Sequence, residues 1–246
     1  MWYNYYGDFM IGKINSFETM GLVDGPGVRF VVFMQGCPIR CLFCHNPETW
    51  NINDKCTCYT PEKLVKKIIN YKPYFKDNGG VTFSGGEPLM QKEFLLKCLK
   101  LCKKNNIHTC LDTAGTIDDC EEILKYTDLV LFDIKGTNKD NYKKMTGGNI
   151  NNSINFLKLC QKLNKKMWIR CVIVPGINDN ITYIDELATF IKEINNVEKI
   201  ELLPYHTLGV HKYKELGIKY QLENTPEMNI EKCKDLENYL KNGLTK

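Results

Sequence analysis

Three cysteines stand close together in this 246-residue chain, at the spacing C-x3-C-x2-C: Cys37, Cys41 and Cys44. They follow an apolar run at residues 28–34, whose β-branched and aromatic content predicts a buried strand. Three thiolates are one ligand short of the four that usually hold a closed iron–sulfur cluster or a structural zinc ion. The spacing therefore predicts a metal site with one open coordination position, where chemistry can take place.

A structural zinc site is the main alternative for this triplet. Such a site usually needs two paired knuckles, whereas the chain has one triplet and no second C-x2-C pair. Cys56 and Cys58 are one residue apart, and Cys98 and Cys102 are spaced by one helical turn. We expect these two pairs to face the core or the surface, so a cluster is the favoured interpretation.

The elements that must position the triplet alternate between strands and helices along the chain. After a short lead-in strand within residues 9–20, strands are expected at residues 28–34, 80–84, 107–112, 129–134, 167–174 and 199–203. Helices are expected from residue 60 and at residues 88–105, 118–125, 152–163, 181–194 and 229–242. This alternation predicts right-handed βαβ units and a parallel sheet. The pattern leaves open both a partial (β/α) barrel and an open doubly wound sheet.

Polar residues and glycines gather where these strands end. In either architecture, ligands bind at the carboxyl edge of the strands. The groups at that edge are Cys37, Ser84-Gly85-Gly86-Glu87, Asp112-Thr113, Asp133-Ile134-Lys135, Pro175-Gly176 and Tyr205-His206. Because six separate strands direct such residues to one edge, we expect a single functional site there.

Composition narrows the class of protein. The chain is 43% apolar and 25% charged, and its net charge of +4 is spread as scattered lysines, which predicts a solvated surface and no nucleic-acid partner. Twelve cysteines without a signal peptide or a membrane-spanning run predict a cytoplasmic protein with reduced thiols and no membrane partner. We expect one domain over residues 1–246, with a lead-in at 1–27, a core at 28–206 and an extension at 207–246.

Several motifs together resemble a known family. The triplet is the signature of the radical S-adenosylmethionine (SAM) enzymes, and residues 84–88, Ser-Gly-Gly-Glu-Pro, stand where that superfamily carries its GGEP element. Residues 16–19, 24–29 and 44–50 resemble the activating enzymes of glycyl-radical enzymes. Within that group, residues 108–113, 133–135, 168–170, 174–176 and 199–206 resemble the members that act on pyruvate formate-lyase. Residues 46–60 hold only two cysteines, too few for the ferredoxin-like insert of other members.

The resemblance implies a fold and a set of cofactor residues. The expected fold is a partial (β/α)6 TIM-like barrel of the radical SAM type. Cys37, Cys41 and Cys44 would hold a [4Fe–4S] cluster, with SAM on the fourth iron. The residues that would contact SAM are Phe43, Cys44, His45, Gly85, Gly86, Glu87, Asp112, Asp133, Ile134, Lys135, Arg170 and His206. Asp112 and Asp133 would also offer oxygens to a monovalent cation beside the SAM carboxylate.

Each of these residues also has a purely structural interpretation. Asp112 and Asp133 could cap helices, Lys135 could be an exposed loop charge, and His206 could be a satisfied histidine in a turn. Arg170 lies inside a predicted strand, where an unpaired charge is costly, so we expect it to pair with a carboxylate.

The implied reaction is the activation of pyruvate formate-lyase (formate C-acetyltransferase) under anaerobic conditions. SAM would be cleaved reductively to methionine and a 5′-deoxyadenosyl radical, which would take a hydrogen atom from a glycine of the partner. Flavodoxin or ferredoxin would supply the electron. The alternatives are a radical SAM enzyme for a small molecule or for anaerobic ribonucleotide reductase, and a non-catalytic iron–sulfur or zinc protein that uses Cys56 as the fourth ligand.

Overall fold

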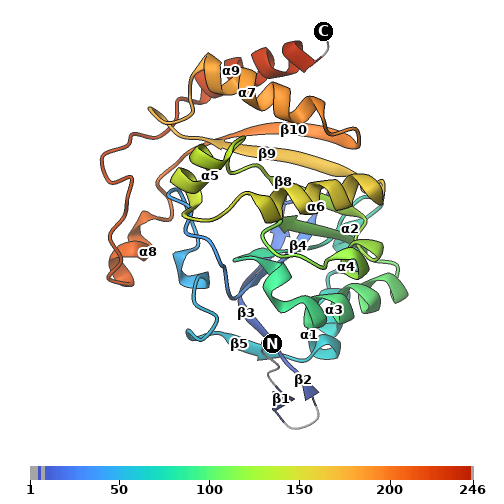
Figure 1. Cartoon of the computed structure of the whole chain (residues 1–246). Helices are drawn as coiled ribbons and strands as arrows, with labels where there is room; N and C mark the ends of the chain where they lie inside the picture. Colours follow the sequence, from blue (N-terminus) through green and yellow to red (C-terminus); the bar gives the residue numbers. More distant parts are fainter. Residues whose placement is uncertain (1–4, 7–8, 245–246) are drawn as a thin grey trace.

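An eight-stranded sheet forms the centre of the molecule, and the computed structural model describes residues 5–6 and 9–244. Six strands run parallel to one another: β4 (Arg29–Met34), β6 (Gly80–Gly85), β7 (His108–Thr113), β8 (Leu129–Asp133), β9 (Met167–Ile173) and β10 (Val197–Pro204). The sheet continues antiparallel through β3 (Gly12–Gly21) and β5 (Thr57–Tyr59), in the order β10-β9-β8-β7-β6-β4-β3-β5. It is an unclosed, mostly parallel sheet, which confirms the α/β class (Figure 1). A separate hairpin joins β1 (Tyr5–Tyr6) and β2 (Phe9–Met10).

Helices lie between the parallel strands and after the last of them. They are α1 (Pro61–Ile69), α2 (Lys72–Phe75), α3 (Lys92–Lys104), α4 (Glu121–Lys125), α5 (Lys139–Thr146), α6 (Asn151–Lys162), α7 (Ile181–Lys192), α8 (Val210–Glu215) and α9 (Ile230–Leu244), with 3-10 turns η1 (Pro47–Thr49) and η2 (Pro88–Gln91). Helix α1 packs beside α3, and α9 packs beside α7 at the β10 edge of the sheet (Figure 1). None of the helices in the described part of the chain is long and apolar enough to cross a membrane.

Local sequence explains where the predicted helices begin. Thr60 caps α1, because its side chain accepts a hydrogen bond from the Lys63 backbone N–H, and Pro61 occupies the first helical position. Leu64 and Ile68 lie one turn apart on the same face and are fully buried in the core. The helix predicted from residue 60 is confirmed.

Helix α5 was not predicted, because its sequence is polar and lacks a clear apolar period. Asn138 starts it through a capping box, in which its side chain accepts from the backbone N–H groups of Asp140 and Asn141. Gly147 ends it with a left-handed backbone at φ 69°. Local capping determines this helix, with only a small buried face.

The parallel register brings distant residues to one level of the sheet. Asp133 on β8 stands beside Arg170 on β9, and Asp112 on β7 stands beside Leu131 on β8. Met34 at the end of β4 stands beside Gly85 at the end of β6. The strand ends predicted to carry chemistry therefore meet at one edge.

Candidate functional site

The three cysteines lie on a loop that leaves the end of β4, residues 36–46, here called the cysteine loop. Gly36 begins it with φ 98°, and a Cβ there would lie 2.8 Å from the Ile52 side chain. The loop is held by backbone hydrogen bonds, from Gly36 N to Thr49 O at 2.7 Å and from Cys37 N to Trp50 O at 3.1 Å. The turn η1 and the residue after it thus fix the start of the loop.

The three thiols lie in a desolvated environment. Burial raises the pKa of Cys37 and Cys44, and it raises the pKa of Cys41 to about 12. Without a metal these thiols are therefore protonated at neutral pH, and metal binding must displace their protons. The loop keeps the three cysteines together: the Cys44 N–H donates to Cys41 O at 3.1 Å, and Cys41 and Cys44 both raise the pKa of Cys37.

Over the described residues, no three His, Cys, Asp or Glu side chains are grouped so that they could hold one metal ion. A [4Fe–4S] cluster makes a different demand, because each thiolate binds a different iron. Cys56 has other neighbours than the triplet: burial raises its pKa, and the next influences on it are Cys58 and Lys13. Cys98 and Cys102 are fully buried, so the structural prediction for them is confirmed.

The glycine turn after β6 packs directly against the cysteine loop. The Gly86 N–H donates to Met34 O at 2.9 Å, and a Cβ on Gly86 would lie 2.2 Å from Gly36 O. Gly85 has φ 104°, and a Cβ there would lie 2.4 Å from Met34 N. Both glycines are required because two stretches of backbone approach closely.

Glu87 ties this turn to the loop after β7. Its buried carboxylate accepts hydrogen bonds from the hydroxyls of Thr113 at 2.6 Å and Thr116 at 3.1 Å, and from Ala114 N at 3.3 Å. Burial raises its pKa, and these donors oppose the shift. The sequence suggested Glu87 as a SAM contact, and the structure shows in addition that its carboxylate ties the glycine turn to the loop after β7.

Four charged side chains form a buried network at the carboxyl ends of β7, β8 and β9. Arg170 donates to Asp133 Oδ1 at 3.0 Å through Nε and to Asp112 Oδ1 through Nη2. Lys135 Nζ lies 2.9 Å from Asp133 Oδ2, and Ser84 Oγ donates to Asp112 Oδ2 at 2.6 Å. The expectation that Arg170 pairs with a carboxylate is confirmed. Two positive and two negative groups balance, and every carboxylate oxygen has a donor.

The network reaches the cysteine loop through Lys135. Burial lowers the pKa of Lys135, but Asp133 and Cys41 outweigh it, so the net shift is upward and the ammonium stays charged. Its Nζ also lies 5.1 Å from the ring centroid of Phe43, which is buried within the loop. Lys135 is thus no exposed loop charge, and it joins the strand ends to the cysteines.

Two carboxyl groups of the network differ in proton affinity. Burial raises the pKa of Asp112, whereas for Asp133 the effect of burial is outweighed by Arg170 and Lys135, and its pKa is lowered. Asp24, in the loop between β3 and β4, has a raised pKa through burial and then through Asp112. The sequence did not mark Asp24 as a candidate site residue, so its proximity to this site is a new finding.

His45 and His206 stack on one another beside the loop. Their ring centroids are 3.9 Å apart with an interplanar angle of 20°, and His45 Nε2 donates to the His206 carbonyl at 2.9 Å. Burial lowers the pKa of His45, so the ring is neutral. His206 Nδ1 is buried and has no hydrogen-bond partner within the described residues. It is therefore available to a bound molecule, and His206 is not a fully satisfied turn histidine.

Helix α8, which is distant in sequence, holds the end of the cysteine loop through hydrogen bonds. Lys212 Nζ donates to His45 O at 3.0 Å, to Asn46 Oδ1 at 3.2 Å and to Glu48 Oε1 at 2.5 Å. The Tyr213 hydroxyl donates to Cys44 O at 3.0 Å. The sequence did not predict these contacts, because 166 positions separate Lys212 from Asn46 and no motif marks it.

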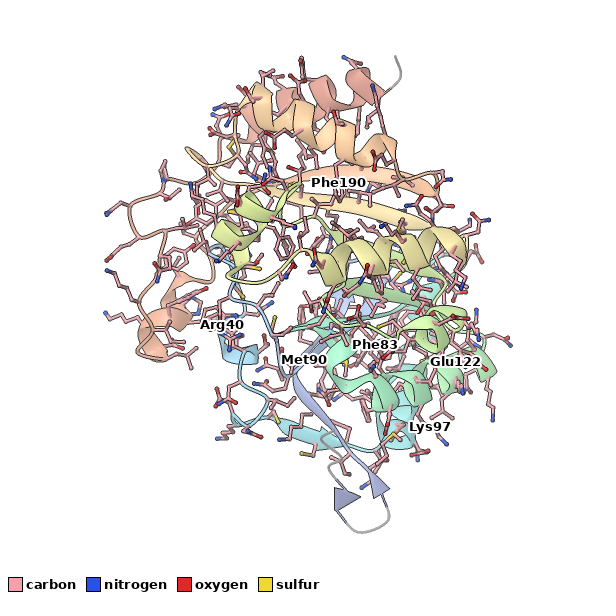
Figure 2. The ribbon with its side chains drawn as sticks, viewed as in Figure 1. Arg40, Phe83, Met90, Lys97, Glu122 and Phe190 are labelled. Carbon is pink, nitrogen blue, oxygen red and sulfur yellow. The ribbon has the colours of Figure 1, made fainter. Side chains whose placement is uncertain are left out.

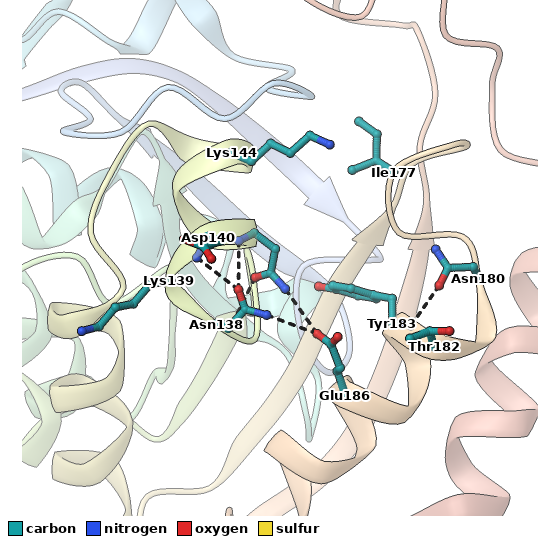
Figure 3. A pocket seen from close by; sticks show the side chains of 10 residues that line it. Asn138, Lys139, Asp140, Lys144, Ile177, Asn180, Thr182, Tyr183 and Glu186 are labelled. Carbon is teal, nitrogen blue, oxygen red and sulfur yellow. Dashed lines mark hydrogen bonds between the residues drawn. The ribbon is translucent and has the colours of Figure 1, made fainter.

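A pocket of about 710 Å³ lies between the N-terminal ends of α5 and α7 (Figure 3). Its polar groups bond to one another: Glu186 Oε2 accepts from Thr137 Oγ1 at 3.0 Å and Asn138 Nδ2 at 3.3 Å. None of the predicted cofactor residues is among those that line it. We therefore treat it as part of the rim around the carboxyl edge.

Comparison with known proteins agrees with this geometry. Residues 31–191 match the model of the radical SAM superfamily. A pyruvate formate-lyase-activating enzyme of Clostridium pasteurianum is 54% identical over 234 residues, which cover 94% of this chain and 98% of that protein. This chain belongs to the pyruvate formate-lyase-activating enzyme family of the radical SAM superfamily.

Other members and more distant folds extend the comparison. The Staphylococcus epidermidis pyruvate formate-lyase-activating enzyme is 46% identical, over 93% of this chain and 95% of that protein. A domain of the enzyme from Bacteroides vulgatus superposes with a TM-score of 0.55 at 24% identity, covering 67% of this chain and 94% of that one. The structure of Streptococcus suis SuiB bound to its precursor peptide SuiA superposes with a TM-score of 0.65 at 19% identity. The match covers 87% of this chain and 45% of that one. These two likenesses concern the fold, and with family membership they confirm the partial TIM-like barrel.

The chain's own residues fit the two cofactors of the superfamily. Three neighbouring thiols on one loop are the donor set for a [4Fe–4S] cluster with one open iron. The free Nδ1 of His206 and the charge-balanced network at the strand ends lie around the same loop. A polar zwitterion such as SAM needs both kinds of group.

Proposed function

We propose that this protein activates pyruvate formate-lyase by producing a glycyl radical on it. The observation that carries the proposal is the 54% identity to an activating enzyme along 94% of the chain, with the cysteine triplet at the carboxyl edge of the sheet. The chain spans nearly the whole length of these relatives.

In this proposal Cys37, Cys41 and Cys44 hold three irons of a [4Fe–4S] cluster. When bound and reduced by the electron donor, the cluster would supply the one-electron chemistry for cleaving SAM and for taking a hydrogen atom from a glycine of the partner. The residues that we assign to SAM binding are Phe43, Cys44, His45, Gly85, Gly86, Glu87, Asp112, Asp133, Ile134, Lys135, Arg170 and His206.

The protein's share of the chemistry is to bind, orient and exclude water. Lys135 and Arg170 hold Asp133 ionised and in one orientation. The Nδ1 atom of His206 has no protein partner in the described structure. The His45 ring stacks on the His206 ring and fixes its orientation. Ile134 and Phe43, both nearly fully buried, keep water away from the Lys135 stem.

The proposal includes partners and a compartment. Flavodoxin or ferredoxin supplies the electron, since neither SAM nor the glycine is a reductant. A monovalent cation is proposed beside Asp112 and Asp133, whose oxygens are hard ligands. The protein works in the cytoplasm, where its thiols stay reduced.

An anaerobic mixing experiment tests the proposal. Reconstituted protein, dithionite, SAM and purified pyruvate formate-lyase are expected to give a glycyl doublet in the EPR spectrum of the partner. Cys37→Ala, Cys41→Ala and Cys44→Ala are each expected to abolish SAM cleavage. Cys56→Ala is the matched control and is expected to keep it.

The possible outcomes separate the alternatives. SAM cleavage without a glycyl doublet would point to another substrate and contradict the assignment of the partner. Zinc without iron in the anaerobically prepared protein would contradict radical chemistry altogether. Loss of the cluster in Cys56→Ala would show that the triplet is not the complete protein ligand set.

A further inference from the structure

Trp50 contacts the cysteine loop with both its backbone and its side chain. Its carbonyl accepts the Cys37 N–H at 3.1 Å. The Arg40 guanidinium lies over its ring, 4.9 Å from the centroid, and Arg40 Nη1 donates to Cys37 O at 2.8 Å and to Ile39 O at 2.9 Å. Figure 2 labels Arg40, whose side chain is exposed at the surface of the loop. Trp50 therefore supports the segment between the first two cysteines.

The indole N–H of Trp50 is the unexplained group. Its Nε1 is buried, and it meets no hydrogen-bond partner of good geometry within the described part of the chain. A buried donor left unpaired is costly, and native structures rarely keep one without a reason.

Cys44 lies beside the Trp50 side chain, because Tyr213 contacts both residues, and its sulfur is the acceptor to which we assign this N–H. Burial raises the pKa of the Cys44 thiol, and the nearby Asn46 backbone N–H and Trp50 side chain lower it. The Asn46 N–H lies 3.4 Å from Cys44 Sγ. A neutral thiol is a weak acceptor, whereas an iron-bound thiolate is a strong one.

The orientation of the indole is fixed by α8. The Tyr213 ring meets the Trp50 ring edge to face, with centroids 5.7 Å apart, while its hydroxyl holds Cys44 O at 3.0 Å. One tyrosine thus positions both the donor side chain and the residue that carries the acceptor.

We propose that Trp50 is a positioning residue for the cluster: its indole N–H donates a hydrogen bond to the Cys44 sulfur and makes one-electron reduction easier. The inference rests on the proposed function, because it requires a cluster on the triplet. A hydrogen bond to a ligand sulfur stabilises the more negative, reduced state, and such bonds are among the factors that set cluster potentials. The protein thereby favours the state that can pass an electron to SAM.

Trp50→Phe tests this, because phenylalanine keeps an aromatic ring below Arg40 and removes only the N–H. The midpoint potential of the cluster is measured by EPR-monitored redox titration of the reconstituted protein. We expect the reduction equilibrium to fall about tenfold, which is a shift of about 59 mV to more negative potential. Trp168→Phe is the matched control, because Trp168 lies on β9 with its ring under Lys199. The midpoint potential of the cluster in this variant is expected to match the wild-type value.

A Trp50→Phe cluster that forms and titrates at the wild-type potential would overturn the inference while leaving the proposed function intact. A wild-type protein that assembles no cluster would overturn the proposed function, and this inference with it. If Trp50→Phe does not assemble a cluster, pulsed EPR of the reduced Trp2→Phe/Trp168→Phe protein with ¹⁵N-labelled indole decides the matter, because Trp50 is then the only tryptophan of the sequence. A ¹⁵N coupling to the cluster supports the hydrogen bond, and its absence contradicts it.

Discussion

The parallel strands bury charged side chains at both ends, and the two ends neutralise them differently. At the amino end, Arg29 is fully buried and donates to Thr82 Oγ1 at 3.0 Å, to Pro26 O at 3.4 Å and to the carbonyls of Val81 and His108. At the carboxyl end, side chains neutralise one another, as the network around Arg170 shows.

This difference separates structural from functional burial of charge. Backbone carbonyls are fixed by the fold, so Arg29 has no freedom to exchange partners and serves stability. Side-chain carboxylates can turn or share their acceptors when a charged molecule arrives. Asp112 and Asp133 can therefore respond to a ligand, and the cysteine loop and His206 stand beside them. We expect substitutions at the amino end to change stability and those at the carboxyl end to change ligand binding.

The largest expected effect follows from Arg29→Ala. The change removes the guanidinium that donates to four acceptors, and it leaves a cavity among Val81, Thr82 and His108. The free energy of unfolding is therefore expected to fall by about 3–5 kcal/mol. Chemical denaturation followed by circular dichroism measures it. SAM affinity of the folded protein, measured by calorimetry below the unfolding transition, is expected to stay at the wild-type value.

Arg29→Lys is the companion variant. Lysine keeps the charge but lacks the planar fork, so it is expected to recover only part of the lost stability. A folded Arg29→Ala protein with weakened SAM binding would contradict the division between the two ends.

Sequence could predict the parts of the site that lie within one loop or follow one strand. The triplet, the glycine turn and the strand ends were placed by spacing and strand pattern, because these features are local. The alternation of strands and helices was sufficient for a parallel α/β sheet, and the family resemblance was needed to choose the partial barrel. Glu87 was identified as a site residue, but only the structure shows that its carboxylate faces Thr113 and Thr116.

The remaining features depend on pairings between distant segments. The register of β7, β8 and β9 determines which carboxylates contact Arg170. The sequence of a single strand does not specify this register. The contacts of Lys212 and Trp50 with the cysteine loop depend on how α8 and η1 fold back. Helix α5 has a capping signal but little apolar periodicity, and periodicity is the stronger guide.

A smaller effect is expected from Asp112→Asn at the carboxyl end. The substitution leaves Arg170 and Lys135 against Asp133 alone, so the site gains a net positive charge while an amide oxygen still accepts from Arg170. SAM carries a positive sulfonium, and a nearby uncompensated cation repels it; we expect its affinity to fall about tenfold. Calorimetry on the anaerobic, cluster-loaded protein measures this, and denaturation is expected to show less change than Arg29→Ala.

Asp128→Asn is the matched control for Asp112→Asn, since Asp128 lies at the amino end of β8. It should leave SAM affinity unchanged. Equal losses of SAM affinity in the two variants would show that the network at the carboxyl end has no special relation to the ligand.

The smallest expected effect concerns the pH dependence of stability at Asp128. Its carboxylate accepts from Thr109 N at 2.9 Å and Thr109 Oγ1 at 3.0 Å and pairs with Lys103. Burial alone would raise its pKa, but Lys103 and Thr109 outweigh burial, so the pKa in the folded protein is lowered. A lowered folded pKa stabilises the protein above the unfolded value of about 3.9, and this stability is lost as pH falls through the folded pKa.

Asp128→Asn removes the titration while keeping an acceptor for Thr109. Because both partners in the ion pair are partly exposed, the stability difference from wild type is expected to be about 1 kcal/mol or less at pH 7 and to shrink below about pH 4. Denaturant titrations from pH 3 to pH 7 measure the two curves. Curves that stay parallel over this range would show that the hydrogen bonds to Thr109, and not the charge on Asp128, stabilise this end of the sheet.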